Sequence, residues 1–243
     1  IFIFLFCFNK HMTFEILNKQ PIKFYKHDGM KFFEPFRAVD NKKQPLNIEW
    51  HFRHNSKSIV AKNRYSDDIS IYDIELSKDE FKGVSLVANP EKRGIGEVLN
   101  LASLISFKEN LAPYFNVFSL RNSIAFFAKY GFNIFSENPN EVIHNLKFLS
   151  KIKGDRFEDT RDSAQYFLGK LNADIDERYK AKTRLLGNNL VSDFIRNMVR
   201  ENKKIDTDDL YSHTHMQFSS LDMLRNADYL NELLEKHEIN YKI

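Results

Sequence analysis

The chain has 243 residues, of which 42% are hydrophobic and 14% are aromatic. This content is enough for a buried core and excludes an intrinsically disordered chain, and the length fits one large domain or a compact domain with an extension. Lys and Arg number 36 against 33 Asp and Glu, which gives a formal net charge of +3. Such a balanced charge argues against a dedicated nucleic-acid-binding protein.

Residues 1–11 begin with eight apolar side chains and include Cys7, the only cysteine of the chain. Eight apolar residues are too few to span a bilayer, and no basic region or small-residue cleavage site accompanies them, so no membrane association is expected. Three interpretations stay open: upstream translation with Met12 as the true start, the remnant of a truncated signal segment, or a buried strand. A single cysteine allows no disulfide within the chain, which fits a cytoplasmic protein.

Short extended segments separated by turns are expected from Met12 to about Ser77. Alternating or β-branched residues predict strands at 13–17, 22–25, 48–54, 58–61 and 69–76. Asp28-Gly29 predicts a turn after the second of these strands.

Residues 84–99 predict a strand, a tight glycine turn and the start of a helix. Pro90 ends the strand because proline cannot donate a ladder hydrogen bond. Gly94 and Gly96 leave the main chain accessible to a phosphate, and Arg93 adds a cation. The following helix has an apolar face, formed by Val98, Leu101, Ala102 and Ile105. The pattern predicts a pyrophosphate site at the helix N-terminus, although such a turn is also common as a purely structural feature.

A second strand and a short helix follow this turn. Residues 114–120 predict a strand, residues 122–130 predict a short helix, and Gly131 suits the C′ position of that helix. The extended pattern resumes at 132–135. Strand, glycine turn and helix are thus followed by a strand, a short helix ending in Gly131-Phe132 and another strand, and this order resembles the GNAT acyltransferase family over roughly residues 69–136.

The resemblance implies an α+β fold with a mixed, mostly antiparallel central sheet flanked by helices. It implies that the first glycine turn holds the pyrophosphate of acyl-coenzyme A, that a strand N–H before the turn binds the oxyanion, and that the second helix lies beside the pantetheine arm. The residues implied to contact this cofactor are Val87, Ala88, Arg93, Gly94, Ile95, Gly96, Asn122 and Phe127. Acetyl-coenzyme A is the expected donor, an amine is the expected acceptor, and no metal is expected.

Acyl transfer to an amine needs a base to free the lone pair of the amine, and an acid to protonate the departing thiolate. The candidate bases on predicted strands are Glu49, His51, Asp73 and Glu75. Glu75 is preferred over Asp73, because its strand is nearest to the turn and its side chain reaches further. The family often has a tyrosine acid where this chain has Phe127, so Tyr130, about one helical turn away, is the candidate acid.

Strand patterns end after Phe135, and turn-forming residues at 136–140 predict a boundary between a domain at 12–138 and a region at 139–243. The second region is predicted to be an all-helical extension. Apolar stripes start at Val142 and Ala164, one helix is expected to stop at Gly187, and further helices are expected at 190–198 and 220–234. These stripes need a cover, either within the extension, on the first domain or on a second copy in a homodimer.

The most basic part of the chain lies between residues 180 and 204. Its cations are Lys180, Lys182, Arg184, Arg196, Arg200, Lys203 and Lys204. They are explained either as solvated helix faces or as a site for a polyanionic partner, such as tRNA or an acidic protein. His213-Thr214-His215 matches no compact zinc spacing and is predicted to be a surface loop.

The first functional hypothesis is an N-acyltransferase that moves an acetyl or other acyl group from acyl-coenzyme A to an amine by direct attack. Glu91, where the family usually has Gln or Arg, and Phe127 indicate an alternative. In this alternative, the protein is a module that binds acyl-coenzyme A without catalysing a reaction, and its helical half mediates partner interactions. A third interpretation treats the glycine turn as a structural part of an unrelated α/β scaffold.

Overall fold

The structure is a computed structural model that describes residues 20–53, 56–63, 69–77, 80–203, 205, 209–211 and 213–243. The predictions for residues 1–11 and 13–17, including Cys7, lie outside the described residues. The chain divides into two compact units, Ile1–Phe115 with Leu224–Ile243, and Asn116–Met223. The boundary expected near residue 138 therefore falls inside the second unit, and the C-terminal residues belong to the first.

The first unit is built on antiparallel strands. β1 and β2 form a hairpin, and β3 to β7 lie side by side in chain order. Asp28 and Gly29 both have positive φ and make the turn that the sequence predicts. The strands are β1 (Phe24–His27), β2 (Met30–Phe33), β3 (Phe36–Val39), β4 (Pro45–Arg53), β5 (Ser56–Asn63), β6 (Ile69–Leu76) and β7 (Phe81–Val87). The strands predicted between residues 22 and 76 are confirmed, with small shifts of their ends.

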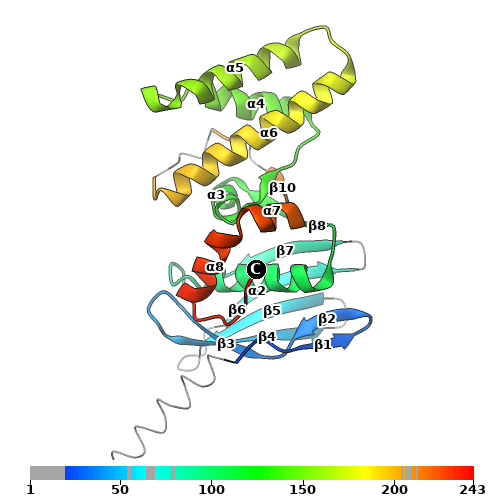
Figure 1. The fold of residues 1–243 in the computed structure, drawn as a ribbon, viewed down its shortest axis with the longest axis vertical. Coiled ribbons are helices and arrows are strands. Elements are labelled where there is room, and N and C mark those ends of the chain that lie inside the picture. Colours follow the sequence, from blue (N-terminus) through cyan, green and yellow to red (C-terminus); the bar gives the residue numbers. More distant parts are fainter. Residues whose placement is uncertain are drawn as a thin grey trace, which may run out of the picture. The chain divides into compact units, whose positions relative to one another are not determined.

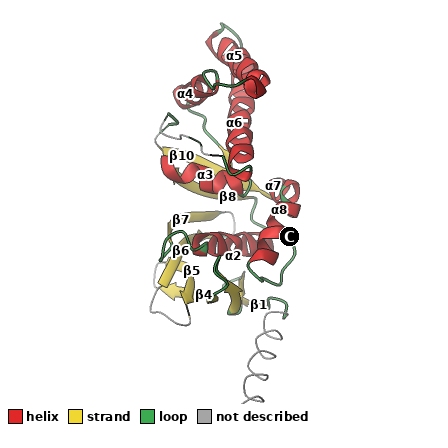
Figure 2. Ribbon diagram, turned by 90° about the vertical axis from the view of Figure 1, so that its left-hand side faces the viewer, coloured by secondary structure: helices red, strands yellow, loops and turns green. Residues whose placement is uncertain are grey.

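Helix α2 (Ile95–Asn110) covers one face of this sheet, as Figures 1 and 2 show. It contacts β2, β5, β6 and β7. The apolar face predicted from Val98 to Ile105 is fully buried, and so are the polar side chains of Asn100 and Ser103. Because both kinds of side chain are buried, α2 is enclosed on more than its sheet-facing side.

The C-terminal segment, which follows α8 (Ala227–Lys236), packs along α2. The imidazole of His237 is fully buried, with Nδ1 2.6 Å from the carbonyl oxygen of Val39 and Nε2 2.7 Å from Glu97 Oε1. The hydroxyl of Tyr241 donates to Glu109 Oε1 at 2.8 Å, near the other end of α2. The end of the chain is thus part of the core of the first unit.

The second unit combines a small sheet with a group of helices. Strand β10 lies between β8 and β9 and pairs antiparallel with β9, and α4, α5 and α6 pack against one another (Figure 2). The elements are β8 (Tyr114–Leu120), which starts at the unit boundary, α3 (Arg121–Lys129), β9 (Asn133–Ile134), α4 (Pro139–Leu149), a 3₁₀ turn (Asp155–Phe157), α5 (Glu158–Asn172), α6 (Glu177–Arg200), β10 (His213–Ser219) and α7 (Ser220–Arg225). The prediction of an α+β chain with mostly antiparallel strands is confirmed.

The expectation that residues 139–243 are entirely helical is wrong, because β10 is a strand in this region. Thr214, Met216 and Phe218 are fully buried, which is the period-two pattern of a strand with one covered face. The surface-loop prediction for His213-Thr214-His215 missed this alternation. The last predicted helix, at 220–234, is divided into α7 and α8.

The expectation that a helix stops at Gly187 is also wrong, because α6 continues through this residue. An ideal Cβ at Gly187 would lie 3.1 Å from Leu146 Cδ1 and 3.4 Å from Val142 Cγ1, both on α4. Glycine at this position therefore allows close packing of α4 and α6 and does not cap a helix.

We expect the same glycine-to-alanine substitution to have opposite effects in two helices. Gly169→Ala in α5 meets nothing within 4 Å, so it should raise the free energy of unfolding by about 0.5–1 kcal/mol through helix propensity. Gly187→Ala should lower it by roughly 1 kcal/mol or more, because Leu146 is fully buried and has little room to move. Chemical denaturation of both variants tests this, and equal stabilisation by both would contradict the packing argument.

Candidate functional site

The candidate site is centred on the corner between β7 and α2. Gly94 has a φ of +79°, and an ideal Cβ at this residue would lie 2.6 Å from side-chain atoms of Asn41. The N–H of Asn41 donates to the carbonyl oxygen of Arg93 at 2.8 Å, which holds the turn against the β3–β4 connection. Glycine is required at position 94 both by its backbone conformation and by the space available. The predicted order of strand, glycine turn and helix is confirmed.

The start of α2 resembles an anion site in its backbone but not in its nearest charged side chains. Gly94 is the N-cap and provides no side-chain cap. The amides of the first turn therefore receive no acceptor from the cap residue, and such amides favour an anion. Glu97, in the same turn, is buried and contacts Lys236 at 2.6 Å and His237. Glu91 and Lys92, just before the turn, are exposed.

Arg93, the expected phosphate-binding cation, is paired inside the protein. Its Nε donates to Asp40 Oδ2 at 2.7 Å, and its Nη2 contacts the same oxygen. The Asp40 side chain is fully buried, and its Oδ1 accepts from the N–H groups of Lys42 at 2.8 Å and Gln44 at 2.9 Å. Arg93 thus neutralises a buried carboxylate that also fixes the turn between β3 and β4.

The two candidate bases on β6 occupy different surroundings. Glu75 lies opposite Lys82, forms an exposed ion pair with it at 2.8 Å, and is near the β6 end farther from the glycine turn. Ile71, which lies opposite Val87, marks the β6 end nearer to the turn. Asp73 lies between these two ends, and the structure therefore brings Asp73 closer to the turn than the preferred Glu75.

Asp73 is held by two hydroxyl groups from the neighbouring strands. Ser58 on β5 donates to its Oδ1 at 2.6 Å, and Ser85 on β7 donates to its Oδ2 at 2.9 Å. The strand registers pair His51 with Ser58, Ser58 with Asp73, and Asp73 with Ser85. This row runs straight across four strands, so its members lie on one face of the sheet.

A charged cluster lies on the same face, on β4 and β5. Glu49 Oε1 contacts Lys62 Nζ at 2.5 Å and His51 Nε2 at 2.8 Å. The hydrogen bond from Lys62, with a further contribution from His51, holds the pKa of Glu49 below its ordinary value of 4.5. Glu49 and His51, which the sequence offered as candidate bases, therefore belong with Lys62 to one hydrogen-bonded group.

The predicted site residues on α3 belong to the second unit. Phe127 is mostly buried and lies 5.5 Å from Phe132 between ring centroids. Tyr130, the candidate acid, is 1% exposed and packs against Phe126 with ring centroids 5.0 Å apart. Gly131 has a φ of +105° after the last turn of α3, as its predicted C′ role requires. The side chain of Asn122 lies outside what the structure describes.

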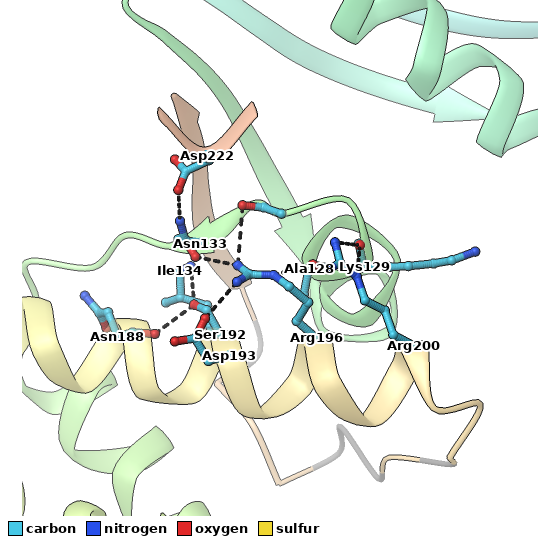
Figure 3. Close-up of polar contacts among 11 residues, drawn as sticks. Ala128, Lys129, Asn133, Ile134, Asn188, Ser192, Asp193, Arg196, Arg200 and Asp222 are labelled. Atoms are coloured by element: carbon cyan, nitrogen blue, oxygen red, sulfur yellow. Dashed lines mark hydrogen bonds and ion pairs between the residues drawn. The ribbon is translucent and has the colours of Figure 1, made fainter. Parts of the chain in front are cut away.

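Two arginines of the basic cluster bind the C-terminal end of α3, as Figure 3 shows. Arg196 donates to the carbonyl oxygen of Ala128 at 3.2 Å and to Asn133 Oδ1 at 2.6 Å, and Arg200 donates to the carbonyl oxygen of Lys129 at 2.8 Å. These guanidinium groups donate to carbonyl oxygens of the last turn of α3, the end of a helix that favours positive charge. The sequence could not reveal this use, because the arginines and α3 are more than 60 residues apart.

Other cations of the cluster form ion pairs with glutamates. Lys180 and Arg184 contact Glu177 at 3.9 and 3.4 Å, and Lys203 contacts Glu201. Lys204 lies outside the described residues. A polyanionic partner at 180–204 stays a prediction.

Two residues of the corner, Asp40 and Asn41, were missed by the sequence analysis. An Asp followed by polar residues is a signal for a local turn, and that turn is found. The contacts of Asp40 and Asn41 with Arg93 and Gly94 span about 53 residues. No local sequence pattern indicates these contacts.

The buried pair of Asp40 and Arg93 gives a stability prediction. Arg93→Met should lower the free energy of unfolding by about 3–5 kcal/mol, because it leaves Asp40 buried without a counter-charge. The double variant with Asp40→Asn should lose less than the sum of the single variants, which a double-mutant cycle by chemical denaturation measures. The exposed pair of Glu75 and Lys82, treated in the same way, should show no measurable coupling. Additive losses at Asp40 and Arg93 would show that they do not act as a pair.

The Glu49 cluster gives a pH prediction. A carboxylate whose pKa is lowered in the folded state stabilises the protein above its unfolded pKa, and the contribution is lost as the pH falls through the folded pKa. We therefore expect the wild-type protein to lose more stability between about pH 6 and pH 3 than Glu49→Gln does. Glu34→Gln removes the same charge at an exposed position of the same unit and is the control variant. Denaturant unfolding at both pH values tests this, and parallel curves for wild type and Glu49→Gln would contradict it.

No helix of the described part of the chain is both long enough and apolar enough to cross a membrane. Comparison of the sequence with protein-family models and with curated proteins, and of the structure with solved structures, found no match. The corner and the strands beside it therefore provide the observations that bear on function.

Proposed function

We propose that the protein is an acyl-coenzyme-A-dependent N-acyltransferase that moves an acetyl or other acyl group to an amine. The order of elements supports this proposal. β7, the glycine turn, α2, β8, α3, Gly131-Phe132 and β9 follow one another in the order that underlies the resemblance to GNAT acyltransferases.

In this proposal, the amides at Gly94, Ile95 and Gly96 bind the pyrophosphate of acyl-coenzyme A. The support comes from a helix N-terminus whose cap residue has no side chain and whose first residue follows a glycine in the left-handed region. Arg93 is occupied by Asp40, so we assign the cation beside the pyrophosphate to the exposed Lys92. This assignment replaces the role expected for Arg93.

The strongest support for the proposal is a β-bulge in β7, because this bulge lies beside Asp73. The register passes from Asp73 opposite Ser85 to Ile74 opposite Gly83, so Val84 has no partner residue on β6. A bulged residue interrupts the ladder and can turn its N–H toward a ligand. We assign the oxyanion contact to the N–H of Val84, in place of the expected Val87 or Ala88, and the general base to Asp73 in place of Glu75.

The proposed reaction joins the amine nitrogen to the thioester carbonyl carbon and breaks the carbon–sulfur bond. Asp73 accepts the proton that the attacking amine loses, directly or through a water molecule. Ser58 and Ser85 hold the Asp73 carboxylate in one orientation through their hydrogen bonds. Phe127 has no proton to give, and Tyr130 is buried. In this proposal, water therefore protonates the departing thiolate.

Phe127 and the buried Tyr130 also favour a second candidate function. A protein that binds acyl-coenzyme A without turning it over needs the glycine corner and no acid. Its helices α4 to α6 would then serve partner binding. The same assays separate the two functions.

We expect coenzyme A to bind the intact protein in calorimetry, and acetyl-coenzyme A with a panel of amines to release free thiol. Asp73→Asn should lower kcat by about 100-fold or more and leave the dissociation constant of coenzyme A within about twofold. Glu75→Gln is the matched control, because it neutralises a carboxylate on the same face of the same strand, and it should keep near wild-type turnover.

Three outcomes would change the proposal. Absence of coenzyme A binding would refute both candidate functions. Binding without turnover would favour the binding module. A loss of turnover in Glu75→Gln but not in Asp73→Asn would return the base to Glu75.

A further inference from the structure

A cavity of about 540 Å³ lies within the second unit and involves residues to which the proposed acyl transfer gives no role. It is contributed by β8, the β9–α4 connection, α4, the segment before β10, and β10 itself. Its principal lining residues are Phe118, Phe135, Ser136, Glu141, Tyr211 and His215. The volume is that of a site for a small organic molecule.

The carboxylate of Glu141 has one satisfied and one unsatisfied oxygen. Glu141 is 8% exposed, and its Oε2 accepts from the hydroxyl of Ser136 at 2.7 Å. Its Oε1 is buried and has no hydrogen-bond partner among the described residues. The Ser136 hydroxyl has a single proton, which it already donates to Oε2, so it cannot also serve Oε1. A buried carboxylate oxygen without a donor is costly, and a ligand that brings an N–H group would remove that cost.

The other walls of the cavity suit a cation on an apolar body. Four of the lining side chains are aromatic rings, and the rings of Phe135 and His215 lie perpendicular with centroids 5.6 Å apart. Among the described residues, the lining also includes Glu137 and contains no Lys or Arg. Aromatic faces attract ammonium groups, and two carboxylates without a matching lysine or arginine make the cavity favour positive charge. No group of three or more His, Cys, Asp or Glu side chains among the described residues is placed to hold a metal ion.

We propose that this cavity binds a primary ammonium ion carried on an apolar, preferably aromatic, body. The ammonium group pairs with the Glu141 carboxylate, which rotates so that its enclosed Oε1 reaches the ligand, and the aromatic walls enclose the apolar part. The site is independent of the proposed acyl transfer, because its residues and its ligand class stand without coenzyme A. Binding to it is measured without any turnover assay.

The test uses 2-phenylethylamine, which is an ammonium ion at pH 7, and its neutral analogue 2-phenylethanol, in ligand-observed NMR titrations of the full chain. The amine should bind roughly tenfold or more tightly than the alcohol, as expected for a hydrogen bond to a charged group. Glu141→Gln should abolish this preference. Glu137→Gln removes the same charge from an exposed lining residue and should change the affinity for the amine by less than about threefold.

A second variant keeps the proposal testable if Glu141→Gln fails to fold, which its thermal unfolding curve will show. Tyr211→Leu, at a partly exposed position, should weaken amine binding by roughly two- to fivefold and affect the alcohol less. Equal binding of amine and alcohol to the wild-type protein, or no binding of the amine at about 10 mM, would overturn the proposal. Unchanged binding in a folded Glu141→Gln variant, or in Tyr211→Leu, would overturn it as well.

Discussion

The buried carboxylate of Asp40 is the constraint on which the first unit depends. A charge that is fully removed from water needs a counter-charge and hydrogen-bond donors, and Arg93 and two backbone N–H groups provide them. This contact joins the β3–β4 turn to the corner before α2. The direction in which α2 leaves the sheet follows from it, and so does the close approach that only a glycine at position 94 permits.

Helix α2 also carries a buried charge that needs partners from elsewhere in the first unit. Because Glu97 on α2 is buried, its carboxylate needs partners, and the C-terminal part of the chain provides Lys236 and His237. His237 lies between Glu97 and the carbonyl group of Val39, and Tyr241 contacts Glu109. The first and last described parts of the chain therefore form one core, which explains why the division into units does not follow the order of the sequence.

The polar side chains that the proposed function uses lie on the sheet face that carries Asp73. Strand register sets their order. Asp73 is held by serines on both neighbouring strands, next to a bulge that leaves Val84 outside the register. In the second unit, the positive charge of α6 is largely used within the unit, since Arg196 and Arg200 cap α3 (Figure 3). In contrast, Oε1 of Glu141 has no hydrogen-bond partner among the described residues, and this contrast separates a structural cluster from a candidate binding site.

The sequence by itself determined the elements whose signals are local. Alternation predicted β4 to β6, and Pro90, Gly94 and the apolar stripe after them predicted the end of β7 and the start of α2, because proline, glycine and periodicity act on their own neighbourhood. Gly131 at the end of α3 was predicted for the same reason. About half of the candidate site, the glycine corner, could be read in this way.

Only the tertiary structure decided what the side chains of these elements contact. It paired Arg93 with Asp40, placed Glu75 with Lys82 near the end of β6 farther from the glycine turn and Asp73 beside the bulge, and showed that Gly187 serves the packing of α4 and α6. It also turned His213–Ser219 into a strand. Each of these outcomes depends on a partner far away in the chain, and residue type and spacing carry no information about such a partner.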